Sequence, residues 1–244
     1  MAYKAHGIVV GVKNWGEADK RVSFFTEERG RIPALAFGCR RPKSPLAAPL
    51  QLFFVLELDL VAGKRVDTVR QAQIITRPKK MMEDLNVMAY AAFVAEFVRD
   101  FLPEGIPEPM VYKLLLRVME AFERRNPRIT AIAAVWQLLE FTGMQLAIER
   151  CARCAKRLEG EARFHEGAGG AVCMTCASRL GVTKPLPASL RALIISLRDF
   201  DWKEETKLRI TGKDLIEAEQ MLICHIEHLL GHSMHALHFI RQLS

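Results

Sequence analysis

The chain has 244 residues, of which 50% are hydrophobic and 26% are charged. This composition is ordinary for a globular protein, so it argues against disorder and allows one large core or two modest ones. The net charge is +7, and residues 1–80 hold 15 Lys/Arg against 7 Asp/Glu, whereas residues 81–244 hold 20 against 21. The excess positive charge therefore lies in the first third of the chain. A basic but unspecialised surface would explain it, but a polyanionic partner explains the localisation better.

The N-terminal segment has no feature of export or membrane insertion. Its first apolar run, Ile8 to Val12, spans five residues. That is too short for the core of a signal peptide, and no run in the chain approaches the roughly 18 apolar residues of a membrane span. We therefore expect a cytoplasmic protein without a membrane partner, in which disulfides are not favoured.

The first 76 residues contain five segments with the pattern of strands. The clearest is the fourth, in which leucines and Phe54 alternate with residues such as Phe53 that face the other way. Five strands with no early long helix predict a small antiparallel barrel of the OB-like type, and an SH3-like barrel fits almost as well. The expected strands are Ala5–Val12, Arg21–Thr26, Arg31–Phe37, Leu50–Val61 and Arg65–Thr76.

From Pro78 onward the apolar periodicity is helical. The predicted fold class is α+β, with an OB-like nucleic-acid-binding domain at 1–78 followed by a helical domain. The helical domain is expected in two parts, 79–150 and 181–244, with a four-cysteine zinc module inserted at 151–180. Thr211 is a plausible N-cap. The expected helices are Glu83–Leu102, Met110–Arg125, Arg128–Gln145, Ala188–Phe200, Thr211–Leu230 and Ser233–Leu243.

Two CxxC pairs provide the strongest motif. Cys151 and Cys154 are separated from Cys173 and Cys176 by an 18-residue segment that is expected to form a short hairpin. This spacing predicts one structural zinc ion per chain, because each CxxC presents two thiolates and four thiolates close the coordination shell. A redox CxxC usually follows a strand, whereas the first pair here follows a helix, and a catalytic zinc would need an open position.

Five of the seven histidines fall near the C-terminus, at 225, 228, 232, 235 and 238. Their spacing of three or four residues places several on one helical face. A metal site or a pH sensor would use such a face, but exposed histidines without a role are the default expectation. The order of Glu227 and His228 does not give the HExxH motif of a metalloprotease.

A basic loop is expected between the third and fourth strands. Arg40, Arg41 and Lys43 lie within four residues, and Pro42 and Pro45 stiffen the segment. Closely spaced cations on a stiff loop are suited to contact phosphates. Solvated basic loops that bind no ligand are also common.

Together these features resemble the RecO family of bacterial recombination mediators. The resemblance rests on the segment Ala34 to Ser44, the leucine-rich strand after it, the position of the four cysteines, and the Leu229-Leu230-Gly231 element. It implies an OB-fold and a helical domain, often with a zinc module. One departure from the family pattern is His232 to His235, where relatives tend to be basic.

The resemblance also implies a function. Family members bind single- and double-stranded DNA, anneal complementary strands, and help RecR load RecA onto DNA coated by single-strand-binding protein. The acidic C-terminal tail of the coating protein docks on the helical domain. For this chain the resemblance implies DNA contact by Arg40, Arg41 and Lys43, and a cytoplasmic, nucleoid-associated location.

Further candidates for DNA contact come from the residues themselves. Strand ends and turns of the same domain add Lys20, Arg21, Lys64 and Arg65. Phe25 and Phe53 are candidates for base stacking because their neighbours Phe24 and Phe54 should point into the barrel, although packing against other parts of the protein is favoured. Trp15 is a third aromatic candidate with a weaker placement.

No catalytic motif emerges, since the chain lacks a Walker loop, a GxSxG motif and a pair of carboxylates placed for metal-assisted cleavage. We therefore expect no enzyme. The alternatives left open are an RNA- or ribosome-associated OB protein with a zinc ribbon and, among enzymes, a zinc-stabilised nuclease.

Overall fold

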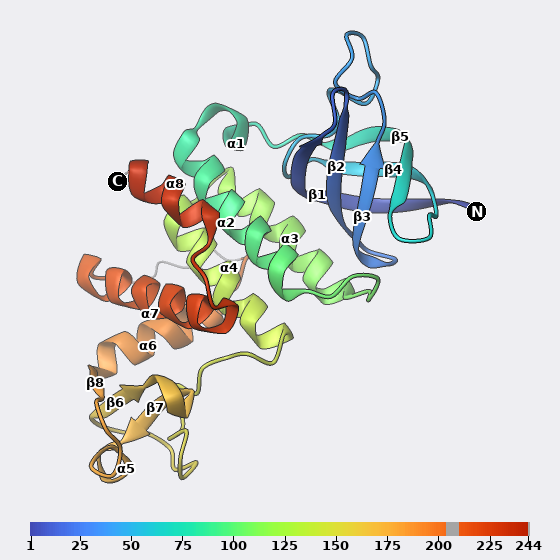
Figure 1. The fold of residues 1–244 in the computed structure, drawn as a ribbon. Coiled ribbons are helices and arrows are strands. Elements are labelled where there is room, and N and C mark those ends of the chain that lie inside the picture. Colours follow the sequence, from blue (N-terminus) through green and yellow to red (C-terminus); the bar gives the residue numbers. More distant parts are fainter. Residues whose placement is uncertain (204–209, 244) are drawn as a thin grey trace. The chain divides into compact units, whose positions relative to one another are not determined.

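The computed structural model describes residues 1–203 and 210–243 (Figure 1). The chain forms two compact units. The first comprises Met1–Ala131 and Met234–Ser244, and the second comprises Ile132–Ser233. Within the segment 181–244, residues 204–209 and 244 lie outside the described residues.

The first unit begins with a closed five-stranded barrel. Its strands follow the order β1-β2-β3-β5-β4, with β3 and β5 parallel and the other neighbours antiparallel. The crossover that brings β5 next to β3 makes this a Greek-key barrel of the OB type, so the predicted α+β fold with an OB-like barrel is confirmed. The strands are β1 (Ala2–Trp15), β2 (Asp19–Thr26), β3 (Gly30–Ala36), β4 (Val55–Val61) and β5 (Asp67–Thr76).

The long first strand closes the barrel because its two halves pair with different partners. Residues Ala2 to Ile8 pair with β4, and Gly7 to Trp15 pair with β2, with a bulge between Val9 and Gly11. A bulge bends the strand and increases its twist, which barrel closure requires. The barrel core then fills with inward side chains that include Phe24, Phe54 and the leucines of β4.

The predicted strand Leu50–Val61 is shorter than expected, because β4 starts only at Val55. Phe53 has a φ of +63°, a left-handed conformation that interrupts an extended strand. The backbone there still forms hydrogen bonds with β1. Phe53 N donates to Val9 O at 2.8 Å, and Val9 N donates to Phe54 O at 3.0 Å. Leu50 remains in the barrel core although it lies outside the strand.

Helix α2 (Leu85–Phe101) is the central helix of the first unit. It begins at Asp84, whose carboxylate accepts from the backbone N–H groups of Asn86 and Val87. Most of its circumference is buried, because it contacts β1 of the barrel as well as α8 (His235–Leu243). A helix that is buried on several sides has apolar residues around most of its circumference, and the sequence of α2 has this distribution. The unit also contains α1 (Lys80–Glu83), α3 (Pro109–Phe122) and the start of α4 (Pro127–Phe141).

The second unit carries the cysteine module on a small sheet with the order β7-β6-β8. The expected hairpin is present, as β6 (Ala162–His165) and β7 (Gly170–Cys173) joined by the 3-10 turn Glu166–Ala168, and β8 (Lys184–Leu186) was not predicted. The unit also contains the rest of α4, from Ile132 onward, and the helices α5 (Met174–Ala177), α6 (Ala188–Arg198) and α7 (Gly212–Leu230). The hydroxyl of Thr211 caps α7 by accepting from Asp214 N at 3.1 Å. Within the described ranges, no helix has the length and apolar character needed to cross a bilayer.

Candidate nucleic-acid interface and metal centre

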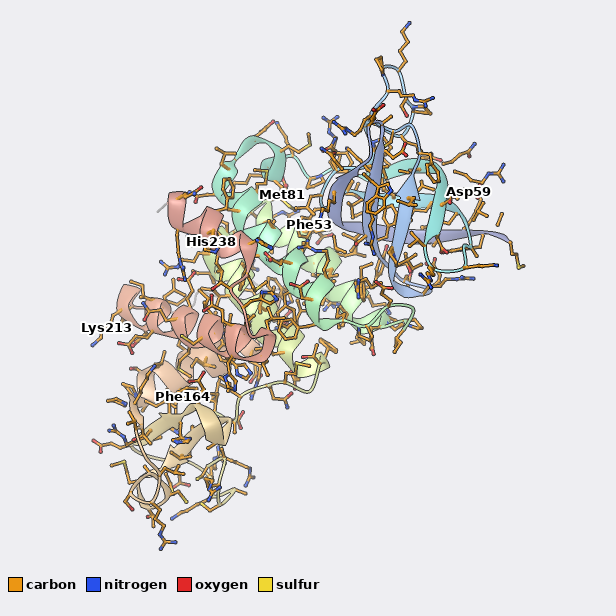
Figure 2. All side chains as sticks on the ribbon, viewed as in Figure 1. Phe53, Asp59, Met81, Phe164, Lys213 and His238 are labelled. Atoms are coloured by element: carbon orange, nitrogen blue, oxygen red, sulfur yellow. The ribbon has the colours of Figure 1, made fainter. Side chains whose placement is uncertain are left out.

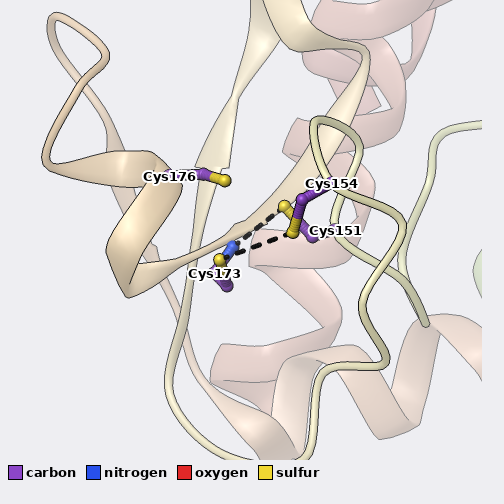
Figure 3. A group of neighbouring side chains, drawn as sticks. All are labelled: Cys151, Cys154, Cys173 and Cys176. Carbon is purple, nitrogen blue, oxygen red and sulfur yellow. Dashed lines mark hydrogen bonds between the residues drawn. The ribbon is translucent and has the colours of Figure 1, made fainter.

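The four predicted metal-ligating cysteines lie together in the second unit (Figure 3). Cys151 and Cys154 come from the loop after α4, Cys173 ends β7, and Cys176 lies in α5. Their four Sγ atoms are all within 4.8 Å of one another. The hairpin of β6 and β7 brings Cys173 and Cys176 close to Cys151 and Cys154, as expected from the sequence.

The cluster has dimensions that suit zinc. With Zn–S bonds of about 2.3 Å, a tetrahedral site separates its sulfurs by about 3.8 Å. The Sγ atoms of Cys154 and Cys173 are 3.9 Å apart. The first knuckle is closed by backbone bonds, from Cys151 N to Lys156 O and from Ala155 N to Cys151 O, both at 2.8 Å. The four cysteines therefore form a preorganised cluster that could hold one metal ion.

The electrostatics of the cluster favour a bound cation. Burial of Cys151 opposes its ionisation, but N–H groups including that of Cys173, whose N lies 3.4 Å from the Cys151 sulfur, outweigh burial and lower the pKa of this thiol to about 6. The hydrogen bond with Cys173 and then burial raise the pKa of the Cys176 thiol to about 12. The charge of the Cys151 thiolate adds a smaller contribution in the same direction, and a divalent cation would offset the repulsion between ionised sulfurs.

The basic loop projects from one end of the barrel, between β3 and β4 (Figure 1). Arg40, Arg41 and Lys43 are all exposed. The loop is anchored to the β1–β2 hairpin, because Gly38 N donates to the Asp19 carboxylate at 2.7 Å and Arg40 N donates to Ala18 O at 2.9 Å. The backbone of this loop is therefore fixed while its three cationic side chains remain accessible.

The other predicted cations fall into two groups. Lys20 and Arg21 lie on β2, close to the loop, and the Lys20 ammonium donates to Leu50 O at 3.4 Å. Lys64 and Arg65 are exposed in the turn between β4 and β5, where Arg65 lines a pocket with Arg29 and Arg31 rather than with the basic loop. The structure thus gathers five of the seven predicted residues at the loop and its neighbouring strand, and leaves Lys64 and Arg65 apart.

Phe25 and Phe53, the two candidates for base stacking, are buried, which agrees with the packing that we favoured for them and rules out the stacking role. Their side chains are 0% and 1% exposed. The alternation was read correctly, since Phe24 and Phe54 belong to the barrel core and Phe25 and Phe53 do not. Outside the barrel, however, they are covered by protein, and Phe53 lies on the side of the barrel next to the helices (Figure 2). Neither ring is accessible to a DNA base, so both side chains serve to pack the protein interior.

Two exposed aromatic side chains lie at the loop instead. Trp15 ends β1 and is 51% exposed, and Phe37 follows β3 and is 56% exposed. Trp15 was a weak candidate from the sequence, and Phe37 was overlooked because it was assigned to the end of a strand. The available signal was its position directly before Gly38, where the chain turns with a φ of +63°.

The C-terminal histidines do not form one site. His225 is half-buried, and its Nε2 lies 2.7 Å from Met144 O. Burial lowers the pKa of His225. His228 lies 3.7 Å from the Glu166 carboxylate, and His232, His235 and His238 are exposed. Among the described residues, none of these histidines joins a group of three potential metal ligands.

Known protein families match nearly the whole chain. The family models Recombination protein O N terminal and Recombination protein O C terminal match residues 1–78 and 82–238. A DNA repair protein RecO from Symbiobacterium thermophilum is 31% identical over 229 residues, covering 92% of this chain and 90% of that relative. One from Pelotomaculum thermopropionicum is 33% identical over 196 residues, 79% and 77% of the two chains. One from Anaeromyxobacter sp. (strain K) is 28% identical over 245 residues, 98% and 96%.

Proposed function

We propose a function from the premise that this chain belongs to the RecO family of DNA repair proteins. In our proposal it acts as a recombination mediator that binds DNA without catalysing a reaction. It holds single strands, allows complementary strands to anneal, and with RecR assists the loading of RecA onto DNA coated by single-strand-binding protein.

The observation that carries the proposal is the cationic end of the barrel. Arg40, Arg41 and Lys43 are exposed on a loop whose backbone is tied to the β1–β2 hairpin, and Lys20 and Arg21 lie on the adjoining strand. Each phosphate that a cation neutralises releases counterions, which favours binding regardless of sequence. Because annealing brings two polyanions together, a protein that neutralises both lowers the repulsion between them.

The protein partners are proposed from the family alone. RecR is expected to join the complex on DNA, and the acidic C-terminal tail of single-strand-binding protein is expected to dock on the helical part of the chain. A tail of acidic character needs a cationic or amphipathic receptor, and the helices offer exposed cations such as Lys113 and Arg117. Pull-down with the tail peptide, and with a peptide whose acidic residues are replaced, tests this part.

We propose that the cysteine cluster binds one structural zinc ion. Its four sulfurs have the spacing of a closed tetrahedral shell, so the ion would stabilise the loop, the hairpin and α5 as one module. Exposed cations flank the first knuckle at 150, 153, 156 and 157, where they would offset the negative charge of four thiolates around a divalent ion. Their role is thus electrostatic compensation.

An annealing assay tests the proposed function. Complementary oligonucleotides, one carrying a donor dye and the other an acceptor, should pair faster with the full chain than without it, with no nucleotide added and no strand cut. The triple variant Arg40→Ala, Arg41→Ala, Lys43→Ala should lose most of this acceleration. The matched control, called the α3 variant, removes the same charge from α3 and the turn after it, with Lys113→Ala and Arg117→Ala in the helix and Arg124→Ala in the turn, and should retain the acceleration.

Three results of this assay would contradict the proposal. Cleaved strands would indicate a nuclease. Binding to RNA with little affinity for DNA of the same sequence would indicate the RNA- or ribosome-associated alternative. Equal loss in the loop variant and the control variant would show that net charge, and not the loop, supports annealing.

A further inference from the structure

The pairing register arranges side chains in rows across the outer face of β1, β2 and β3. Lys13 pairs with Arg21, which in turn pairs with Leu35. One step further along, Trp15 pairs with Asp19. Phe37 directly follows β3, after Ala36, the partner of Lys20, and the next residue, Gly38, donates its N–H to the Asp19 carboxylate at 2.7 Å. Directly opposed residues point to the same face of a sheet, so Trp15 shares a face with Asp19. Together with Phe37 at the adjoining end of β3 they form an aromatic row beside Lys13 and Arg21.

Both aromatic side chains of this row are open to solvent. Trp15 is 51% and Phe37 is 56% exposed. The remaining large aromatic side chain with comparable exposure among the described residues is Phe141 at 43%, and it lies in the second unit. Exposing an indole and a phenyl ring to water forgoes the free energy of burying them. Their position next to the basic loop suggests that a ligand covers them.

The charges around the two rings suit a polyanion. Lys13 and Arg21 are exposed in the neighbouring row. The Arg40 guanidinium lies over the hairpin after Trp15, with Nη1 3.1 Å from Glu17 O and 3.4 Å from Gly16 O. The acid within the aromatic row, Asp19, is engaged by Gly38 N at 2.7 Å. Glu17 at the hairpin tip is exposed and stands outside the two rows.

We infer that Trp15 and Phe37 form a base-stacking surface by which the barrel binds single-stranded DNA in preference to duplex. Strand β2 lies between the ends of β1 and β3 that carry Trp15 and Phe37, so their backbones are about 10 Å apart, two strand spacings, and each ring can receive its own base. Unpaired bases expose their faces to such rings, whereas the bases of a duplex are already stacked on their neighbours. This inference rests on the proposed function, which supplies the DNA.

Equilibrium binding of the full chain to a single-stranded oligonucleotide and to its duplex tests the inference. Trp15→Ala and Phe37→Ala should each weaken single-strand binding on the order of ten-fold, since a stacked base contributes about that factor. Duplex binding should change by less than about two-fold, and the salt dependence should be unchanged because no charge is removed. Phe141→Ala, which deletes an equally accessible ring elsewhere, should leave both affinities unchanged.

Tryptophan fluorescence gives a second readout. The chain has three tryptophans, and Trp136 is 2% exposed while Trp202 is half-buried. Single-stranded DNA should quench the emission of the wild-type chain and of Phe141→Ala. The quenching should be largely absent in Trp15→Phe, a variant that keeps an aromatic ring and should retain most of the affinity.

The possible results separate this inference from the proposed function. If the wild-type chain binds single strands and both alanine variants bind them equally well, the stacking surface is refuted and the proposed function stands. An equal loss on single strands and duplex also refutes it, because stacking acts only on unpaired bases. If the wild-type chain binds neither form of DNA, the proposed function and the inference fail together.

Discussion

The buried carboxylate of Glu96 should fix the C-terminal helix to the first unit. Glu96 lies on α2 and is 3% exposed. Its Oε1 and Oε2 accept from the backbone N–H groups of His235 and Ala236, each at 2.7 Å. These N–H groups begin α8 and have no partner within the helix, so the carboxylate acts as an N-cap supplied by a residue 139 positions away.

The magnitude follows from these two bonds. A hydrogen bond to a charged group contributes about 1.5–3 kcal/mol, and removing the acceptor leaves two N–H groups without a partner in a dry site. We therefore expect Glu96→Ala to weaken the attachment of α8 by about 3–5 kcal/mol. Glu96→Gln retains one acceptor oxygen of similar shape, so we expect it to cost about half as much.

Hydrogen exchange monitored by mass spectrometry measures this effect on the peptide that contains α8. Exchange should become faster by at least about 100-fold in Glu96→Ala and by on the order of ten-fold in Glu96→Gln. Glu120→Ala, which removes an exposed carboxylate from α3, should leave α8 exchange unchanged. Wild-type exchange rates of α8 in Glu96→Ala would show that its apolar contacts alone hold the helix and that the two hydrogen bonds to Glu96 contribute little.

Three further predictions concern the two units. Cys151→Ser should reduce the zinc content found by elemental analysis and lower the melting temperature, and equal melting with and without a chelator would contradict a structural metal. Gly30→Ala places a Cβ 1.8 Å from Ile106 O at a φ of +63°, so the urea midpoint should fall well below that of Gly105→Ala, which has a φ of +75° and open space. Burial lowers the pKa of His225 below 6.5, so the stability it contributes is present above that value and lost as pH falls below it, and His225→Gln should flatten the stability profile below pH 6.5.

The parts of the fold that the sequence predicted are those with local causes. Alternation in β2 and β3 comes from side chains that pack directly across a ladder, so their ends differ from the expectation by at most two residues. The clustering of the four cysteines was predicted for the same reason, because a CxxC knuckle closes through its own backbone. In both cases the residues that interact lie close together in the sequence, so the pattern itself is enough to predict the structure.

The features that could not be predicted depend on distant residues. A period of two distinguishes the inside of the barrel from the outside, but the burial of Phe25 and Phe53 depends on what packs outside the barrel. The interruption at Phe53 depends on its bonds to β1, and the role of Glu96 depends on α8, which is separated from it by most of the chain. These contacts cannot be predicted from a local sequence pattern, because neither partner has an unusual residue type or spacing within its own segment.

The salt dependence of DNA binding shows whether the cations of the basic loop contact phosphates. Affinity for a single-stranded oligonucleotide is measured from low to moderate salt for the wild-type chain, for the variant Arg40→Ala, Arg41→Ala, Lys43→Ala, and for the charge-matched α3 variant. The loop variant should lower the slope of log affinity against log salt by about two to three, near one for each lost phosphate contact, and the α3 variant should not. A loop variant with the wild-type slope would show that these cations do not contact phosphates, and the account would be wrong.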